Sequence, residues 1–318
     1  MLGSRSRSST SARAAVDLTT EIGSVTLPAP VMTASGTAGH GDELAAFFDL
    51  SVLGAIVVKS LAPFAWQGNP APRVHETAGG MINSVGLQGP GVVAWRKDEL
   101  PALRRSGARV VASIWGRTID DYRVAAEQLV GAEGVIAVEV NVSCPNLEDS
   151  KRMFAHDPAM AAAVIEATEV CGFPRWAKLS PNVTDITEIA GAVFRAGAEA
   201  VTLANTVMGL VIDIETRLPV LGGGGGGLSG PGVRPVALRA VYETQAAHPD
   251  LPIIGVGGIC TAEHAVEFLM AGACAVQVGT AAFADPRASN LVQTGLTEWC
   301  RNHEIESVRQ LIGTAHQS

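Results

Sequence analysis

Short apolar runs alternate with longer amphipathic stretches from residue 28 onward. Eight of the runs are brief, continuous and rich in β-branched residues, which is typical of parallel strands buried on both faces. They lie at residues 29–34, 54–59, 109–114, 135–141, 175–179, 199–205, 252–257 and 274–279. Helical patterns occupy residues 118–131, 157–172, 184–198, 232–247 and 261–273. Strands that alternate with helices in this way predict βα units.

The number of strands decides between two architectures. Eight strands in about 250 residues match a (β/α)8 TIM barrel, whereas a doubly wound open sheet would need a different count. We therefore expect a single α/β barrel domain over residues 21–318. Residues 1–20 are rich in arginine and serine, with no acidic residue before Asp17. A transit peptide is one interpretation of this segment, but a disordered tail is favoured because it lacks the apolar run of a secretory signal.

A barrel predicts where chemistry should occur, because ligands of this fold bind at the C-terminal ends of the strands. Polar residues or glycines stand at all eight expected ends. In chain order they are Ser35 and Gly36, Lys59 and Ser60, Ser113, Asn141, Lys178, Asn205 and Thr206, Gly257 and Gly258, and Gly279 and Thr280.

The last two strand ends have the character of a phosphate site. Gly257 and Gly258 precede Thr261, which is suited to cap a helix, and Gly279 precedes Thr280. Glycines there let backbone N–H groups approach an anion, and barrels often bind phosphate after strands seven and eight. Tight βα turns would need the same glycines. Both pairs together favour a ligand that carries a phosphate.

Lysines and asparagines add polar groups to the same face. Lys59 and Lys178 each follow an apolar run, and a lysine is seldom buried without a partner. They are suited to an anionic ligand, or to a Schiff base on one of them. Four asparagines, each more often a turn residue when taken alone, provide paired donors and acceptors for a planar heterocycle. They are Asn83, in a glycine-rich loop expected after strand two, and Asn141, Asn146 and Asn205.

Cys144 differs from the other cysteines because it follows a strand end and begins a polar loop. Its thiol is suited to act as a general base or a nucleophile, since its reference pKa is about 8.5. Cys171, Cys260, Cys274 and Cys300 are expected to behave as small hydrophobic residues. The five cysteines show no CxxC spacing, so neither a zinc site nor a bound iron–sulfur cluster is expected. Unpaired thiols favour a cytoplasmic protein.

Composition limits the classes of partner that the protein is expected to bind. The 318 residues carry a net charge of −8, which argues against a nucleic-acid footprint. No uninterrupted apolar stretch reaches the length of a membrane span. Because the net charge is negative, any anionic ligand must be held by a few local groups and not by the overall charge of the protein.

Eight motifs in order resemble the class 1 dihydroorotate dehydrogenases over residues 21–290, most closely the catalytic subunit of class 1B. They read VVKSL (57–61), INSVGLQGPG (82–91), NVSCPN (141–146), AKLSPNVTDI (177–186), ANT (204–206), GGLSGPGVRPVALR (226–239), GVGGI (255–259) and VQVGTA (276–281). The resemblance implies FMN-dependent oxidation of (S)-dihydroorotate to orotate in pyrimidine biosynthesis. It implies that Cys144 removes a proton from C5 while hydride leaves C6 for the flavin.

Residue roles carry over from the same resemblance. It implies that dihydroorotate is bound by Lys59, Asn83, Val85, Gly86, Leu87, Asn141, Asn146, Asn205 and Thr206. It implies that FMN is bound by Ser35, Gly36, Lys59, Ser60, Ser113, Asn141, Lys178, Gly230, Gly257, Gly258, Gly279 and Thr280. It further implies a homodimer and, for the 1B type, a separate subunit with FAD and a [2Fe–2S] cluster; the 1A type uses fumarate instead.

Three positions depart from the family pattern. Ser113 is shorter than the asparagine that many 1B enzymes have there. The run Gly222–Gly227 suggests a loose loop, and Val207 and Met208 replace a more polar or basic pair. Two alternatives therefore remain: a flavin oxidoreductase acting on another dihydropyrimidine, and a phosphate-binding lyase barrel that uses a lysine.

Overall fold

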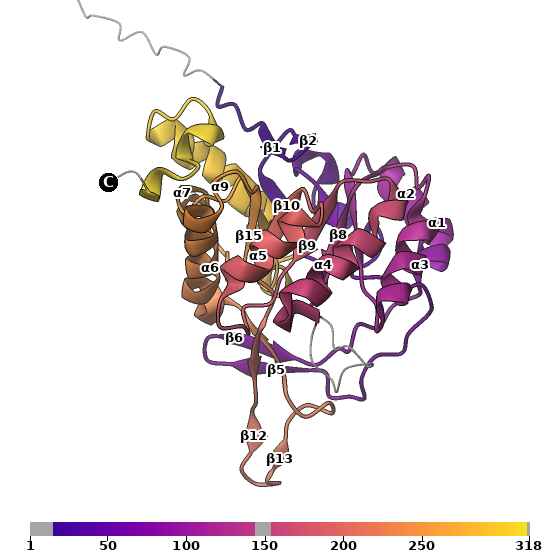
Figure 1. Cartoon of the computed structure of the whole chain (residues 1–318). Coiled ribbons are helices and arrows are strands. Elements are labelled where there is room, and N and C mark those ends of the chain that lie inside the picture. Colours follow the sequence, from indigo (N-terminus) through magenta and orange to yellow (C-terminus); the bar gives the residue numbers. More distant parts are fainter. Residues whose placement is uncertain (1–14, 144–153, 317–318) are drawn as a thin grey trace, which may run out of the picture.

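The computed structural model describes residues 15–143 and 154–316 and forms a (β/α)8 barrel (Figure 1). The eight parallel strands follow one another in the order β3, β16, β15, β10, β9, β8, β7 and β4. Their bounds are Val31–Thr33 (β3), Ile56–Val57 (β4), Val110–Ile114 (β7), Val135–Asn141 (β8), Arg175–Lys178 (β9), Ala200–Leu203 (β10), Ile253–Val256 (β15) and Ala275–Val278 (β16). Each falls within one of the eight predicted runs, so the predicted fold class is confirmed.

The two ends of this sheet meet and close the barrel. Met32 of β3 forms a parallel bridge with Ala55, just before β4. The amide of Gly54 donates to the carbonyl of Val31 at 2.8 Å. Closure removes the exposed strand edges that an open sheet would leave.

Helices surround the barrel, and their apolar faces pack on the outward-facing strand residues. The longer ones are α3 (Ile119–Leu129), α4 (Pro158–Ala167), α5 (Ile186–Arg195), α6 (Arg234–Ala247), α7 (Ala262–Met270) and α9 (Ala288–Asn302). The shorter ones are α1 (Val92–Asp98), α2 (Leu100–Arg105) and α8 (Ala281–Ala284). All five predicted helical stretches contain a helix. Thr261 caps α7 as expected, because its side chain accepts a hydrogen bond from the amide of His264.

The barrel interior is apolar at the N-terminal ends of the strands. Met32, Val111, Trp176 and Ile254 pack there with Ile22 and Leu27, which come from the strands β1 (Thr20–Ile22) and β2 (Val25–Leu27). The β1–β2 hairpin therefore closes the bottom of the barrel. Before β1, Asp17 already pairs with Ser307, so the chain contacts the barrel inside the segment expected to be a tail.

A second sheet lies over the opposite end. Its strands pair in the order β11, β14, β6 and β5, with bounds Val207–Gly209 (β11), Gly226–Ser229 (β14), Gly80–Asn83 (β6) and Val74–Thr77 (β5). The expected loop around Asn83 was therefore wrong, because Asn83 ends a strand. The interpretation of Gly222–Gly227 as a loose loop was wrong for Gly226 and Gly227, which are buried in β14; the four glycines before them precede the strand. Beyond this sheet, β12 (Ile212–Asp213) and β13 (Leu218–Pro219) form an arm that projects from the molecule (Figure 1).

Candidate active site

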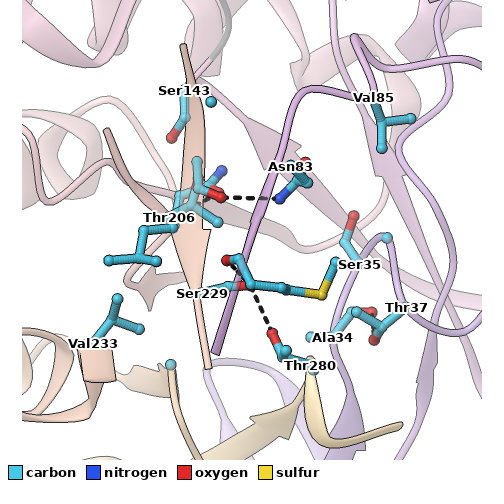
Figure 2. A pocket seen from close by; sticks show the side chains of 18 of the residues that line it. Ala34, Ser35, Thr37, Asn83, Val85, Ser143, Thr206, Ser229, Val233 and Thr280 are labelled. Atoms are coloured by element: carbon cyan, nitrogen blue, oxygen red, sulfur yellow. Dashed lines mark hydrogen bonds between the residues drawn. The ribbon is translucent and has the colours of Figure 1, made fainter. Parts of the chain in front are cut away.

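A cavity of about 370 Å³ lies between the C-terminal ends of the barrel strands and the second sheet. This volume is within the range of about 300–1,000 Å³ that is common for small-molecule sites. Figure 2 shows side chains from both sheets around it, among them Ser35 and Thr280 from the barrel and Asn83 and Ser229 from the second sheet. The barrel therefore forms the floor of the site, and the second sheet forms its roof.

The cavity brings together nearly all of the predicted site residues that the structure describes. Those that line it are Ser35, Gly36, Lys59, Ser60, Asn83, Val85, Gly86, Leu87, Asn141, Lys178, Asn205, Thr206, Gly230, Gly257, Gly258, Gly279 and Thr280. Cys144 and Asn146 lie outside the described residues. Ser113 is fully buried behind the floor and does not line the cavity.

One end of the cavity is a cradle of backbone. Gly257 and Gly258 have φ values of +134° and +70°, which a side chain would strain. A Cβ on Gly258 would lie 2.8 Å from the carbonyl oxygen of Gly230, so the two segments approach more closely than any side chain allows. Thr280 donates to the hydroxyl of Ser229 at 2.8 Å (Figure 2). Glycine backbone therefore lines this end of the cavity, and such backbone suits the binding of a phosphate group.

The floor carries a buried ion pair. The Nζ atom of Lys178 lies 3.6 Å from Oε1 of Glu139, and their side chains are 7% and 0% exposed. Lys59 lines the cavity from another strand end, after β4. Two lysines therefore give the polar floor a positive character that suits an electron-rich ligand.

Asparagines form a connected group beside the lysines. Asn205 donates to the side-chain oxygen of Asn141 at 3.1 Å and accepts from the amide of Thr206 at 2.8 Å. From the roof, Asn83 donates to the carbonyl of Gly227 at 3.2 Å. These contacts fix the amide groups in place, as recognition of a heterocycle requires.

Three serine hydroxyls link the cavity floor to the barrel interior. Ser35 and Ser60 both line the cavity and lie 3.0 Å apart. Ser113 lies 3.2 Å from Ser35 and 2.9 Å from Ser60, and it donates to Glu139 at 3.3 Å. Ser113 is therefore connected to the cavity through the hydroxyls of Ser35 and Ser60.

Sequence reasoning missed several lining residues, among them residues of the second sheet. Leu228 and Ser229 line the cavity from β14, Met81 lines it from β6, and Val74 lines it from β5. Nothing in their local pattern distinguishes them, because their contact with the barrel depends on pairing between distant segments. Ser143 also lines the cavity, and its buried hydroxyl has no hydrogen-bond partner within the described chain. Its place next to a strand end was the one available signal.

His40 is a partly buried side chain that interacts electrostatically with Lys59. Burial, and then the charge of Lys59, lower the pKa of His40 below its usual value. The imidazole is therefore neutral near pH 7 and adds no second cation at this wall.

Metal chemistry has no support in the part of the chain that the structure describes. No group of three or more His, Cys, Asp or Glu side chains there is arranged to hold a metal ion. Among the same residues, no helix is both long and apolar enough to cross a membrane.

The fold and cavity define a (β/α)8-barrel enzyme whose site combines a phosphate cradle with a polar floor that carries lysines. The sequence model of the dihydroorotate dehydrogenase family matches residues 17–299. The chain belongs to this family, whose members are oxidoreductases and in general depend on a flavin. Oxidation of dihydroorotate in pyrimidine biosynthesis is the activity that this membership supports.

Individual relatives agree with the family assignment. The chain is 49% identical over 298 residues to dihydroorotate dehydrogenase B (NAD(+)), catalytic subunit, of Desulforudis audaxviator, covering 93% of this chain and 97% of the relative. It is 47% identical over 293 residues to the protein of the same name from Alkaliphilus oremlandii, covering 92% and 96%. The corresponding Alkaliphilus metalliredigens protein is 46% identical over 300 residues, covering 94% and 99%. The predicted class 1B resemblance is thereby confirmed.

Proposed function

We propose that this chain is the catalytic subunit of an NAD-linked dihydroorotate dehydrogenase and that its flavin is FMN. The observation that carries the proposal is that one cavity joins the glycine cradle, the two lysines and the asparagine group to Ser143. Ser143 immediately precedes Cys144 in the sequence. A single phosphate at one end and a planar ring over the polar floor would account for both halves of the cavity.

The residues present fit FMN. Gly257, Gly258 and Gly279 line one end of the cavity, where main-chain N–H groups would be available to a phosphate. Lys178 and Lys59 would lie near the ring, where positive charge stabilises the electron density that reduction adds. When bound, FMN supplies the acceptor for the hydride that leaves C6 of dihydroorotate.

The remaining groups of this chain would orient dihydroorotate and move one proton. Asn83, Asn141 and Asn205 provide fixed donors and acceptors for its ring amides and carboxylate. Cys144 would take the proton from C5 as the C5–C6 double bond of orotate forms. Asn146 would add a further contact from the same motif. These last two roles rest on the sequence motif.

A separate subunit would carry electrons onward to NAD⁺. Support comes from the relatives, whose names specify a catalytic subunit and NAD(+). Exposed apolar side chains also lie at the rim of the cavity: Val74, Met208 and Phe283 are 54%, 55% and 60% exposed. We propose that the partner carries FAD and a [2Fe–2S] cluster, that the catalytic subunit forms a homodimer, and that the assembly is cytoplasmic, as its free cysteines favour.

The decisive experiment is the visible spectrum of the purified chain with FMN, before and after anaerobic addition of dihydroorotate. We expect a flavin band that bleaches, and no NAD⁺ reduction until the partner subunit is added. A flavin band that stays unbleached would move the substrate to another dihydropyrimidine. A chain that cannot bind FMN would contradict the proposal.

Cys144 can be tested in the same assay. Cys144→Ala should retain FMN but lose flavin reduction by dihydroorotate by about 100-fold or more, since positioned proton transfer contributes about 10²–10⁴-fold. Cys144→Ser should keep a small activity that rises with pH, because a hydroxyl is a weaker acid than a thiol. Cys300→Ala is the matched control, since Cys300 is buried in α9 away from the cavity. Normal turnover by Cys144→Ala would show that another group is the base.

A further inference from the structure

A carboxylate with no assigned role lies directly beneath the cavity floor. Glu139 comes from the middle of β8, and its side chain is fully buried in the barrel interior. Burial of a charge is costly unless the group is paired and hydrogen-bonded. Well-packed apolar residues often replace a buried ion pair without loss of stability. The position therefore calls for an explanation other than stability.

Four side chains from four other strands hold this carboxylate. Oε2 accepts from Nε2 of Gln277 at 2.7 Å and from Oγ1 of Thr202 at 3.3 Å. Oε1 accepts from Ser113 at 3.3 Å and lies 3.6 Å from Nζ of Lys178. Because these partners come from β16, β10, β7 and β9, the carboxylate is fixed from several directions.

The network connects to the cavity floor at two points. Lys178 lines the cavity, and only 7% of its side chain is exposed. Ser113 contacts the cavity-lining hydroxyls of Ser35 and Ser60. Gln277, Thr202 and Ser113 are themselves 0% exposed, so water does not compete for Glu139 from the barrel interior. Glu139 is thus linked to side chains that line the cavity floor.

We propose that Glu139 is a positioning residue that holds the ammonium group of Lys178 at the cavity floor and thereby makes the bound flavin a better electron acceptor. This inference rests on the proposed function, because it requires the flavin. A fixed positive charge stabilises the electron-rich reduced ring more than the oxidised ring. Without Glu139, the flexible lysine side chain would no longer be held at that position.

The test is the midpoint potential of FMN bound to the Glu139→Gln variant. The amide is close to the carboxylate in size but removes the charge that attracts Lys178. We expect the potential to fall, and the rate of flavin reduction by dihydroorotate to fall with it, while the Kd of dihydroorotate stays within about threefold. Glu243→Gln is the matched control, since Glu243 pairs with Arg239 on the surface, and it should leave the potential unchanged.

A double-mutant cycle shows whether Lys178 carries the effect. In a Lys178→Met background, Glu139→Gln should no longer lower the potential. Gln277→Leu provides a second route if Glu139→Gln does not fold, because it removes the 2.7 Å hydrogen bond but keeps both charges. It should shift the potential in the same direction by a smaller amount.

Each outcome decides the proposal. A rise in potential would mean that Glu139 only weakens the field of Lys178, and would overturn the positioning role. An unchanged potential, or a fall that persists in Lys178→Met, would also overturn it. In these cases FMN binding and bleaching by dihydroorotate would still support the proposed function. Failure of the wild-type chain to bind FMN would instead refute both.

Discussion

Single residues set how closely the roof approaches the floor, and Gly226 is the clearest case. A Cβ at this position would lie 2.4 Å from the carbonyl oxygen of Asn83 and 2.8 Å from the side chain of Leu221. The first contact is with backbone of the paired strand β6, which cannot move without disturbing the sheet. Gly226 is therefore a packed part of the site, although six consecutive glycines predict flexibility when read alone.

Gly226→Ala should accordingly destabilise the protein by about 1–3 kcal/mol, the usual cost of overpacking. It should also weaken FMN binding, because Gly226 lines the cavity. Gly225→Ala is the control within the same run, since its nearest contact to a new Cβ is 3.3 Å, to the carbonyl of Gly209. Urea unfolding of both variants without FMN measures the difference. Equal stability of the two would contradict the packed structure of β14.

Residue types at strand ends were the most predictable part of the site. Lys59, Lys178 and Asn141 were expected at one face because parallel strands end together, and all three line one cavity. Glu139 was not expected, because a carboxylate inside a strand is read as part of an apolar run. Its function depends on Gln277 and Thr202, which become neighbours only when the barrel closes.

At the scale of elements, the barrel strands were predictable because each is a continuous apolar run. The second sheet was not, since β14 contains two glycines and β6 begins with one. Its register, with Gly227 opposite Asn83, joins segments 144 residues apart. No local pattern encodes such pairing, so the glycines around Asn83 predict a loop where the structure has a strand.

The β12–β13 arm contributes little to the stability of the barrel. Ile214 is 82% exposed, and surface substitutions of this kind change stability by about 0.5 kcal/mol or less. Ile214→Ser should therefore leave both urea unfolding and dihydroorotate-driven flavin bleaching unchanged. Ile82→Ser, in the buried part of β6, should cost several-fold more free energy of unfolding, because Ile82 is 1% exposed. A large loss of stability from Ile214→Ser would mean that the arm packs on the rest of the chain.

At the scale of the whole molecule, the barrel interior consists of two layers of side chains. An apolar layer around Trp176 and Ile254 lies at the bottom beneath the β1–β2 hairpin. A polar layer around Glu139 lies above it, beneath the cavity. Because both layers come from alternate positions of the same strands, ligand binding at the mouth should be linked to the stability of the bottom.

The reactivity of Cys274 can be used to measure whether ligand binding at the mouth stabilises the bottom of the barrel. It packs with Ile22 and Leu27 at the bottom of the barrel, and burial raises the pKa of its thiol to about 12. Alkylation by iodoacetamide at about pH 8 should therefore be slower at Cys274 in the native chain than in the unfolded chain by at least about 100-fold. Mass spectrometry at each cysteine measures the rates, with the half-buried Cys260 as the faster internal comparison.

FMN then distinguishes global from local opening. If Cys274 is exposed only when the entire barrel unfolds, FMN at about 100 times its Kd should slow its labelling by a further ~100-fold, because a ligand stabilises only the folded state. If the β1–β2 hairpin opens alone, FMN bound at the mouth would leave the rate unchanged. We expect the first result, because Thr20 at the start of β1 donates to the carbonyl of Cys274 at 2.7 Å and ties the hairpin to strand β16. The hairpin should then separate from the barrel only when β16 unfolds. Because β16 leads directly to Gly279 and Thr280, its unfolding would also disrupt the cavity.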